Sequence, residues 1–434
     1  MKKKKKFSLW KTPGMFIAAG FAGVILAGTL LLLMPFSVRS DASVSFIDAL
    51  FTSTSAVCVT GLIAIDVADH FTPIGQAIVA VLIQVGGLGV TSVGVGLIIA
   101  AGKRVSLRGR NLVKEALNID SYRGIVRLVK GVLLLTLCFE LTGAILSFIV
   151  FVQDYEPLHA AGISLFHSIA AFNNSGFDIL GGLRNLTPYY DNVLLNLTTC
   201  FLIIFGGLGF LVILDILKQK RFKKLMLHSK VVIVTSIGLI LAGTLLLKAT
   251  EDISWLGAFF QSVSARTAGF STYSIGSFTN AGLFVLCLLM FIGASPGSTG
   301  GGIKTSTFFV LIQEVRSTFT KRKASAFKRG ISDSNISKAG LITILSGTVV
   351  CIATFLMCVL EPDRTFIQLF FEVVSAFGTV GLSTGITPDL CWGAKLVIIF
   401  VMFIGRLGAM TLVSMWIGHS ESNVQYTEET ISIG

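Results

Sequence analysis

The sequence predicts an all-α integral membrane protein made of four repeats, each a membrane span, a short re-entrant helix and a second span. The first observation is composition: of 434 residues, 53% are hydrophobic and only 13% are charged, whereas soluble domains carry about 25% charged residues. The second is a set of long apolar runs, and the third is a set of shorter apolar segments between them. We therefore expect eight transmembrane helices and four re-entrant half-helices in a pseudo-fourfold arrangement.

The long apolar runs are each long enough to cross a bilayer, which takes about 20 residues in a helix. The first run follows a basic stretch, but it is too long for a secretory signal and no small-residue cleavage site follows it, so we expect it to be retained. The lipid bilayer is thus the first expected partner. The predicted spans cover about 15–36, 74–101, 128–152, 192–217, 231–249, 281–313, 339–360 and 394–418.

Four shorter apolar segments lie between successive pairs of spans, at 46–59, 165–174, 255–266 and 366–378. A helix rises 1.5 Å per residue, so about 14 residues reach only about 21 Å, short of the ~30 Å hydrocarbon core. Such a segment cannot cross the bilayer. Each is therefore predicted to enter the membrane and return on the same side.

The positions of lysine and arginine predict the orientation through the positive-inside rule. The connections 103–130, 218–230 and 316–338 hold eight, six and seven basic residues, whereas each connection with a short segment holds one. We expect a multi-pass protein of the cell membrane with both termini cytoplasmic and the short helices entering from outside. The net charge of +12 follows this topology, so it does not indicate a nucleic-acid partner.

A turn with glycine follows each short segment. The four glycines, Gly61, Gly176, Gly269 and Gly381, are 115, 93 and 112 residues apart, and a glycine-containing motif follows 24 to 30 residues after each. Four matches in register indicate four related hairpins around one axis. The expected units are 1–102 with the basic N-terminus, 103–224 with a basic cytoplasmic connection, 225–337 with a broken second span, and 338–434 with a cytoplasmic tail.

The turns carry the chemistry of a cation path. Re-entrant backbone is tolerated at membrane depth only where it is buried or faces water, so the four turns should converge on an aqueous path. The C-terminal end of each short helix bears partial negative charge, and exposed carbonyl oxygens replace the hydration shell of an alkali ion. Glycine permits the positive φ that such a turn needs. The alternative is four ordinary helix C-caps, which the shared register disfavours.

The hairpins also resemble those of a known superfamily, the bacterial Trk and Ktr potassium-uptake subunits and the plant HKT transporters. The resemblance is closest to the Ktr-type membrane subunit and covers nearly the whole chain. It is carried by residues 46–52 (FIDALFT) with 59–62 (VTGL), 172–177 (FNNSGF), 266–270 (RTAGF) and 375–382 (SAFGTVGL). Only the fourth turn reads Thr-Val-Gly, so the sequence leaves the choice between potassium and sodium open.

The resemblance implies a potassium filter formed by main-chain carbonyls of the four turns. It also implies a homodimer whose tail, 428–434, packs at the subunit interface, and a separate cytosolic RCK ring that binds ATP or ADP and docks on the basic inner face. No nucleotide is expected on this chain, and a coupling or activating role of sodium stays open. The implied filter residues are Val59, Thr60, Gly61, Asn174, Ser175, Gly176, Thr267, Ala268, Gly269, Thr379, Val380 and Gly381.

The third repeat's second span contains a helix-breaking segment, 293–305. Five glycines and one proline fall within its first ten residues, at a cost of roughly 1 kcal/mol per glycine and 3 for proline in a helix. We interpret the break as an intramembrane gating loop, which the resemblance favours. Close helix packing through small residues is the alternative. A nucleotide-phosphate loop is disfavoured because Ile303 precedes Lys304 within an apolar span. The predicted gate residues are Gly293, Pro296, Gly297, Gly300, Gly301, Gly302, Lys304 and Arg406.

Arg406 lies in the middle of the last span, where an unpaired arginine costs about 2.5–3.5 kcal/mol on insertion scales. We expect it beneath the filter, paired with a carboxylate or with carbonyls of the broken loop; reaching the interface is the alternative, as it is for Lys304. Asp48 and Glu372 are either cation-concentrating acids or a solvated rim. Arg266 is expected to brace the third turn from behind, and the role of Glu140 stays open.

No acid–base pair, activated nucleophile or metal-ligand cluster is evident, so we expect no enzyme. The seven cysteines lie almost all in apolar stretches without CxxC spacing and are interpreted as packing residues. The expected function is inward potassium transport, down its gradient or coupled to sodium. The alternative is a secondary cation transporter with alternating access through discontinuous helices; the single polarity of the four short segments favours a pore.

Overall fold

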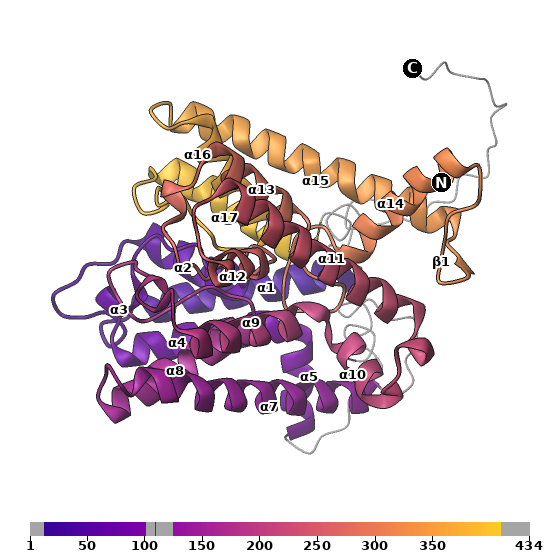
Figure 1. Cartoon of the computed structure of the whole chain (residues 1–434). Coiled ribbons are helices and arrows are strands. Elements are labelled where there is room, and N and C mark those ends of the chain that lie inside the picture. Colours follow the sequence, from indigo (N-terminus) through magenta and orange to yellow (C-terminus); the bar gives the residue numbers. More distant parts are fainter. Residues whose placement is uncertain (1–12, 101–108, 110–124, 409–434) are drawn as a thin grey trace, which may run out of the picture.

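The computed structural model describes residues 13–100, 109 and 125–408 (Figure 1). The first quarter of the chain contains α1 (Pro13–Leu32), α2 (Phe46–Val57), α3 (Val67–His70), α4 (Pro73–Leu88) and α5 (Val90–Ala100). The second contains α7 (Ile125–Phe151), α8 (Pro157–Phe172), η1 (Thr187–Tyr189), α9 (Val193–Leu208), α10 (Phe210–Gln219) and η2 (Phe222–Lys224).

The third quarter contains α11 (Leu227–Thr250), α12 (Trp255–Ser264), η3 (Ile275–Ser277), α13 (Asn280–Phe291), α14 (Thr305–Thr320) and the antiparallel pair β1 (Ser325–Ala326) and β2 (Arg329–Gly330). The fourth contains α15 (Asp333–Leu360), α16 (Phe366–Gly378) and α17 (Trp392–Leu407). The predicted all-α character is confirmed. The basic N-terminus, most of the connection 103–130 and the tail 428–434 lie outside the described residues.

The long helices present apolar side chains to their surroundings. On α7, Leu134, Leu137, Leu141, Ile145 and Ile149 are all exposed and follow one another at spacings of three or four residues, so they form a continuous apolar stripe along one face. Aliphatic side chains exposed in this way over a helix of 27 residues suit contact with lipid rather than water. The chain is a membrane protein.

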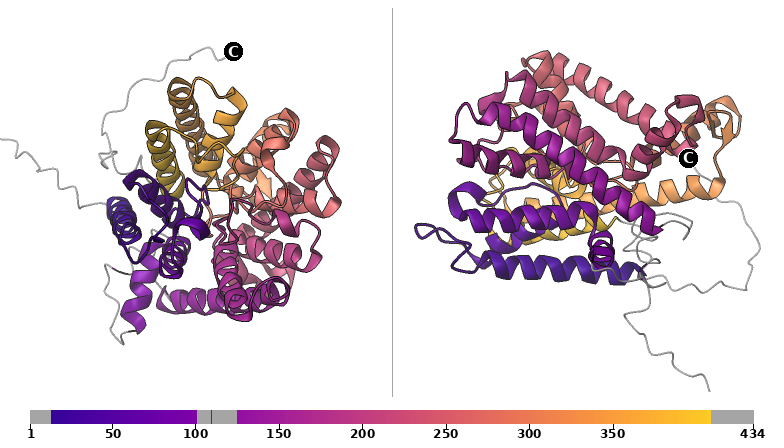
Figure 2. Two further views of the ribbon diagram at one scale, coloured as in Figure 1. Left: turned by 90° about the vertical axis from the view of Figure 1, so that its left-hand side faces the viewer. Right: turned by 90° about the horizontal axis from the view of Figure 1, so that it is seen from below.

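The four quarters of the chain lie around a common centre when the molecule is viewed along its helices (Figure 2, left). Within each quarter a short helix leans on the long helix before it: α2 contacts α1, α8 contacts α7, α12 contacts α11 and α16 contacts α15. The four short apolar segments of the sequence are therefore helices, although α8 begins at Pro157, eight residues earlier than expected.

A serine of the short helix fastens it to the long helix in three quarters. Ser53 Oγ donates to Ile25 O at 2.7 Å, Ser168 Oγ to Glu140 O at 2.6 Å and Ser262 Oγ to Ile240 O at 2.8 Å. A glycine three residues after each acceptor gives the serine room, because a Cβ on Gly28, Gly143 or Gly243 would lie 2.4–2.5 Å from that hydroxyl.

We expect Gly28→Ala to lower the stability of the purified protein by about 1–3 kcal/mol, the usual cost of overpacking a filled site. The added methyl would displace Ser53 from its bond to α1. Gly23→Ala is the matched control, because it lies in the same helix and its Cβ would meet nothing within 4 Å. Thermal unfolding in detergent measures both, and equal melting temperatures for the two variants would contradict this packing.

The second spans depart from the prediction of eight full-length helices. The axis turns by 98° between α4 and α5 and by 97° between α9 and α10, at Gly89 and Gly209, whose φ values are 82° and 91°. Gly408, with φ 82°, ends α17 in the same conformation. Among the described residues four helices can each span a membrane, or up to six if each bent pair counts as one.

The bends are caused by backbone conformation, which a hydropathy profile does not reveal. A residue with φ near +85° cannot continue a right-handed helix, and glycine adopts that conformation without steric cost. Because apolar residues continue on both sides of Gly89 and Gly209, the ranges 74–101 and 192–217 read as uninterrupted spans, and that interpretation is wrong. The predicted break in the third quarter is confirmed: α13 ends at Phe291 and α14 begins at Thr305.

Candidate functional site

The four turn glycines meet one another in a closed ring. Each packs so tightly on the turn of the next quarter that no side chain fits between them. A Cβ on Gly61 would lie 1.9 Å from the carbonyl oxygen of Ser175, on Gly176 2.7 Å from that of Ala268, on Gly269 2.2 Å from that of Val380, and on Gly381 2.2 Å from that of Thr60. The contacts run from the first quarter to the second, third and fourth and back to the first.

The sign of the backbone φ angle alternates along each turn. The residue two before each glycine has positive φ, 56° at Val59, 59° at Asn174, 76° at Thr267 and 49° at Thr379, and the glycines have φ between 67° and 96°. The residue between them is right-handed or extended. Alternation of this kind turns successive carbonyl oxygens toward the same side of the strand, which is the arrangement that coordinates a bare cation.

The amide groups of the turns point back to the short helices. The N–H of Thr60 donates to Ser55 O, that of Ser175 to Ala170 O, that of Ala268 to Ser264 O and that of Val380 to Ser375 O, all at 2.8–2.9 Å. Within the described residues the carbonyls of Thr60, Ser175, Ala268 and Val380 accept no hydrogen bond. These oxygens are the ones that adjoin the neighbouring glycines, so they are free to act as ligands on the inner side of the ring.

Serine side chains hold the turns from behind, a feature that we did not predict from the sequence. The Gly61 N–H donates to Ser55 Oγ at 3.0 Å, and the Gly381 N–H donates to Ser375 Oγ at 3.1 Å. In the third quarter Ser264 Oγ donates to Phe270 O at 2.5 Å. The sequence does contain a pattern that could have predicted this role: a serine lies five or six residues before the turn glycine. This serine is present in three of the four turns, and Ala170 replaces it in the second.

A cavity of about 490 Å³ opens above the ring. Gly61, Gly269 and Gly381 form part of its wall, and Ile63 and residues of the connections 183–188, 271–276 and 382–388 form the remainder. The cavity thus leads from the loops that follow the turns to the ring itself. It gives the carbonyl oxygens an entrance from one side.

The glycine-rich loop between α13 and α14 lies against the other end of three turns. The Gly301 N–H donates to Thr379 Oγ1 at 2.8 Å, and Thr299 Oγ1 donates to Asn174 Oδ1 at 3.2 Å. A Cβ on Gly300 would lie 2.2 Å from Thr267 Oγ1. The loop therefore touches the first residue of the second, third and fourth turns.

The remaining predicted gate residues hold the loop against the second spans and close it on itself. Pro296 O would lie 2.7 Å from a Cβ on Gly209, and Gly297 O accepts from the Phe210 N–H at 3.1 Å. Gly301 O would lie 2.2 Å from a Cβ on Gly293, and Gly302, with φ 69°, adjoins Gly293 as well. A Cβ on Gly293, Gly300 or Gly301 would lie 2.2–2.6 Å from a neighbouring atom, so a side chain would not fit at these three positions without movement.

Arg406 joins this loop to a different quarter of the chain. Its guanidinium donates to Thr299 O of the loop and to Gly86 O of α4, and reaches Gly87 O at 3.3 Å. Lys304 Nζ donates to Gly300 O at 2.6 Å. Both cationic groups bind carbonyl oxygens of the loop, which for Arg406 is one of the two expected pairings.

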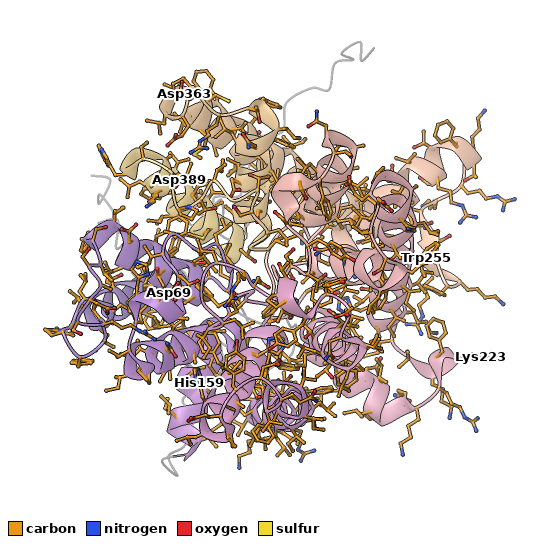
Figure 3. The ribbon with its side chains drawn as sticks, turned by 60° about the vertical axis from the view of Figure 1, so that its left-hand side comes forward. Asp69, His159, Lys223, Trp255, Asp363 and Asp389 are labelled. Carbon is orange, nitrogen blue, oxygen red and sulfur yellow. The ribbon has the colours of Figure 1, made fainter. Side chains whose placement is uncertain are left out.

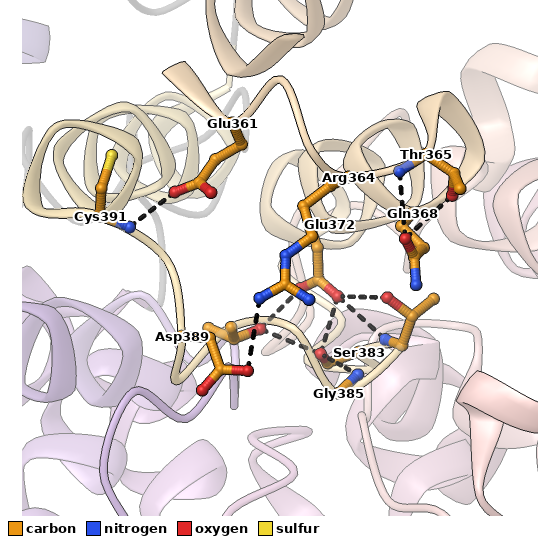
Figure 4. Close-up of polar contacts among 11 residues, drawn as sticks. Glu361, Arg364, Thr365, Gln368, Glu372, Ser383, Gly385, Asp389 and Cys391 are labelled. Carbon is orange, nitrogen blue, oxygen red and sulfur yellow. Dashed lines mark hydrogen bonds and ion pairs between the residues drawn. The ribbon is translucent and has the colours of Figure 1, made fainter.

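Asp48 and Glu372 do not form the cation-concentrating rim considered from the sequence. Asp48 pairs with Lys395 of α17 at 2.8 Å. Glu372 is fully buried and accepts from Ser383 Oγ at 2.7 Å and Thr387 Oγ1 at 2.7 Å (Figure 4). Both carboxylates therefore tie segments together. Neither is a solvated acid at the mouth of the cavity.

Two further buried polar residues support the turns. Asn173 Nδ2 donates to Gln84 Oε1 at 2.8 Å and to Glu140 Oε1 at 3.1 Å, so Glu140 orients the residue that precedes the second turn. Arg266 donates from Nη1 to Ser236 O at 3.3 Å and from Nη2 to Ser236 Oγ at 3.3 Å. It therefore braces the third turn against α11, as its position in the sequence suggested.

A buried carboxyl also lies in the connection between α8 and α9, outside the spanning helices. Burial raises the pKa of Asp178 to about 7, with smaller contributions in the same direction from the neighbouring Asp66 and Asp69, and the Leu180 N–H and Arg184 oppose the shift. The Leu180 N–H donates to Asp178 Oδ1 at 3.0 Å. The group thus changes charge near neutral pH, in a loop beside the cavity.

We expect the stability of the protein to fall as the pH rises from about 4 to about 7 and to level off above that, because a carboxyl whose pKa is raised on folding stabilises the folded state only while it stays protonated there. Asp178→Asn cannot ionise and keeps the acceptor for Leu180, so its melting temperature should exceed that of the unmodified protein at about pH 8 and approach it at about pH 4. Parallel melting curves across this range would contradict the assignment.

The chain is similar to known cation transport proteins over nearly its whole length. The TrkH family model, described as a cation transport protein, matches residues 3–426. The chain is 38% identical to the potassium/sodium uptake protein NtpJ of Enterococcus hirae, over 99% of both chains. It is also 38% identical to the Ktr system potassium uptake protein B of Bacillus subtilis, over 98% of this chain and 97% of that one.

Among solved structures, the crystal structure of the potassium transporter TrkH from Vibrio parahaemolyticus is similar in fold. The TM-score is 0.74 at 20% sequence identity, and the match covers 96% of this chain and 88% of that one. The fold described above is therefore shared with that protein over nearly the whole chain.

Proposed function

Since the chain belongs to the TrkH family of cation transport proteins, we propose that it takes up potassium through a central pore. The carbonyl oxygens of the four turns form the selectivity filter, and the cavity above them is its outer vestibule. The chain then comprises four span–short helix–span repeats, with the boundaries expected from the sequence, in a pseudo-fourfold arrangement.

One observation carries this proposal: the closed ring of glycine contacts from Gly61 to Gly176, Gly269, Gly381 and back. Four independent helix C-caps would not be expected to contact one another, and they would not be expected to do so in the order of the quarters along the chain. Carbonyl oxygens that lack a hydrogen-bond donor inside a membrane protein are costly, and a bound alkali ion offsets that cost. The names of relatives, which refer to potassium or potassium/sodium uptake, support potassium as the ion in this proposal.

The loop over residues 293–305 acts in this proposal as the gate. It lies against the ends of three turns and is held by Arg406, whose positive charge also repels a permeating cation at this depth. Opening requires the loop to leave Thr379 and Arg406 to release Thr299 O. The short hydrogen-bond path between the loop and the filter supports a gate at this position.

The partners proposed from the resemblance complete the function. The relatives with Ktr system names fit a membrane subunit that works with other components. We propose a homodimer in the cell membrane with both termini cytoplasmic, regulated by a cytosolic RCK ring that binds ATP or ADP. Sodium is proposed as a coupling or activating ion, as one relative's name includes it.

A second candidate is a transporter with alternating access, which the bent pairs α4–α5 and α9–α10 and the broken α13–α14 favour, since such transporters use discontinuous helices. The two candidates differ in how flux depends on concentration. A pore passes potassium at a rate that follows the electrochemical gradient, whereas a transporter saturates at its cycling rate.

Growth of a potassium-uptake-deficient bacterium on limiting potassium tests the function itself. Expression of the unmodified chain should restore growth, and purified chain in proteoliposomes should admit potassium down an imposed gradient. Excess external sodium shows whether that ion competes or stimulates. Failure to restore growth, with the chain confirmed in the membrane and in the presence of its regulatory subunit, would contradict the proposal.

A further inference from the structure

The structure brings two basic segments together at the end of the molecule that the proposed orientation places in the cytoplasm. Segments 218–230 and 316–332 hold twelve lysine and arginine residues and no aspartate or glutamate. We call the surface that they form the basic patch. Figure 3 shows Lys223, one of its members, at the edge of the molecule.

Aromatic contacts unite the two segments, although about a hundred residues separate them. The rings of Phe222 and Phe327 meet edge to face with centroids 6.2 Å apart. Lys230 Nζ lies 6.0 Å from the centroid of Phe327 and donates to Lys223 O at 2.8 Å. Phe222 and Phe327 nevertheless remain 46% and 41% exposed. The patch is therefore one surface that combines positive charge with accessible apolar rings.

The basic patch lies where a membrane surface is expected. Because α10 turns by 97° from α9, α10 runs roughly parallel to the plane of the bilayer when α9 lies along the membrane normal. Phe210 and Ile213 of α10 are buried in the protein, whereas Leu217 near its end and Met226 beyond it are 59% and 61% exposed. An amphipathic helix of this kind, with basic residues at its end, is typical of the headgroup region.

Within the described residues the ion pairs are Arg364–Asp389 and Lys395–Asp48, so no acid there forms an ion pair with the patch, although the exposed Asp333 adjoins it in sequence. The nearby Asp215 is buried and accepts from Ser229 Oγ at 2.6 Å and the Met226 N–H at 2.9 Å, so it faces inward. Lysine and arginine side chains gathered on one surface repel one another, and a polyanionic surface relieves that repulsion.

We infer that the basic patch binds the phosphate headgroups of anionic phospholipids in the cytoplasmic leaflet, with Phe222 and Phe327 among the acyl chains. Clustered lysine and arginine beside a spanning helix, with aromatic rings at the same level, is the combination that anionic headgroups attract. The RCK ring that the resemblance implies on the basic inner face would match the charge, but it would leave the apolar side chains beside the membrane without a role.

Binding of lipid headgroups to the basic patch should also affect the gating loop through α10. This consequence rests on the proposed function. The helix α10 begins at Phe210, whose N–H donates to Gly297 O of the loop at 3.1 Å. Its other end leads into the basic patch through Lys218 and Lys220. Anionic lipid therefore fixes the helix on which the loop leans, and we expect potassium flux to depend on it.

The test uses the full-length purified chain. Its retention of phosphatidylglycerol over phosphatidylcholine is measured by native mass spectrometry, and its potassium flux is measured in vesicles of phosphatidylcholine with increasing phosphatidylglycerol. We expect selective retention that weakens with salt, and a flux that changes several-fold with phosphatidylglycerol. Lys223→Gln, Lys224→Gln, Lys328→Gln and Arg329→Gln combined should lose both effects and keep the flux in pure phosphatidylcholine.

Two control variants test whether the effects depend on the charge of the basic patch. The same positions changed with retention of charge, Lys223→Arg, Lys224→Arg, Lys328→Arg and Arg329→Lys, should behave as the unmodified chain. Arg127→Gln with Lys130→Gln, at the start of α7, removes cations elsewhere and should change neither readout.

Unchanged lipid retention by the neutralised variant would overturn the inference and indicate a protein partner for the patch, as would equal loss in the α7 control. Absence of any phosphatidylglycerol preference in the unmodified chain would overturn it as well. Selective retention without potassium flux in any vesicle would instead contradict the proposed function and leave the lipid site intact.

Discussion

Gly381→Ser is expected to abolish growth on limiting potassium and to reduce potassium flux by at least roughly tenfold, since losing 1.4 kcal/mol of ion binding is about a factor of ten. A Cβ at this position would lie 2.2 Å from Thr60 O, one of the oxygens proposed to bind the ion. The oxygen must move away from the ring, and the residual flux should discriminate less against sodium. Flux assays with potassium and sodium in turn measure both effects.

Gly385→Ser is the matched control for this variant. Gly385 has φ 94°, close to the 96° of Gly381, and lies four residues later, but its Cβ would meet nothing within 4 Å. It therefore carries the same backbone strain without the clash. If both variants lose uptake equally, backbone strain in the connection explains the loss, and the role of the ring is contradicted.

Arg406→Gln is expected to raise potassium flux. The guanidinium donates to Thr299 O of the loop and to Gly86 O of α4, so it fastens the loop beneath the ring. Hydrogen bonds from a charged donor contribute about 1.5–3 kcal/mol each, so removal of one favours the open loop by roughly tenfold. Flux into proteoliposomes at a fixed gradient should increase accordingly.

Arg406→Lys separates the hydrogen bonds from the charge. Lysine keeps the positive charge beneath the ring but cannot bridge two carbonyl groups with a planar fork, so its flux should fall between that of the unmodified chain and that of the glutamine variant. A glutamine variant that folds normally and conducts no more than the unmodified chain would show that Arg406 does not hold the gate shut.

Much of the fold could be predicted because hydropathy reports length directly. The spans over α1, α7, α11 and α15 agree with the structure within a few residues at most ends. The corners at Gly89 and Gly209 could not be predicted from hydropathy, because both arms of each bend are apolar. Their positive φ is a local property of one glycine, and it shows in the sequence only as the last glycine of Gly-Gly-Leu-Gly.

The part of the candidate site that could be predicted is the part that recurs in all four quarters of the chain. The four glycines share a register along the chain, and the structure brings them together. Partners far apart in sequence gave no such signal. Arg406 meets Gly86, 320 residues away, and Lys395 meets Asp48, 347 residues away. Such contacts depend on closure of the ring between the first and fourth quarters, which a single sequence does not encode locally.

The most direct test of the ring is anomalous diffraction from crystals of the protein in rubidium or thallium, which replace potassium and can be located. The proposed filter predicts one or more ions on the axis between the carbonyl oxygens of Thr60, Ser175, Ala268 and Val380. Well-ordered density for these turns with no ion between them, while the same ion is found elsewhere in the protein, would contradict it.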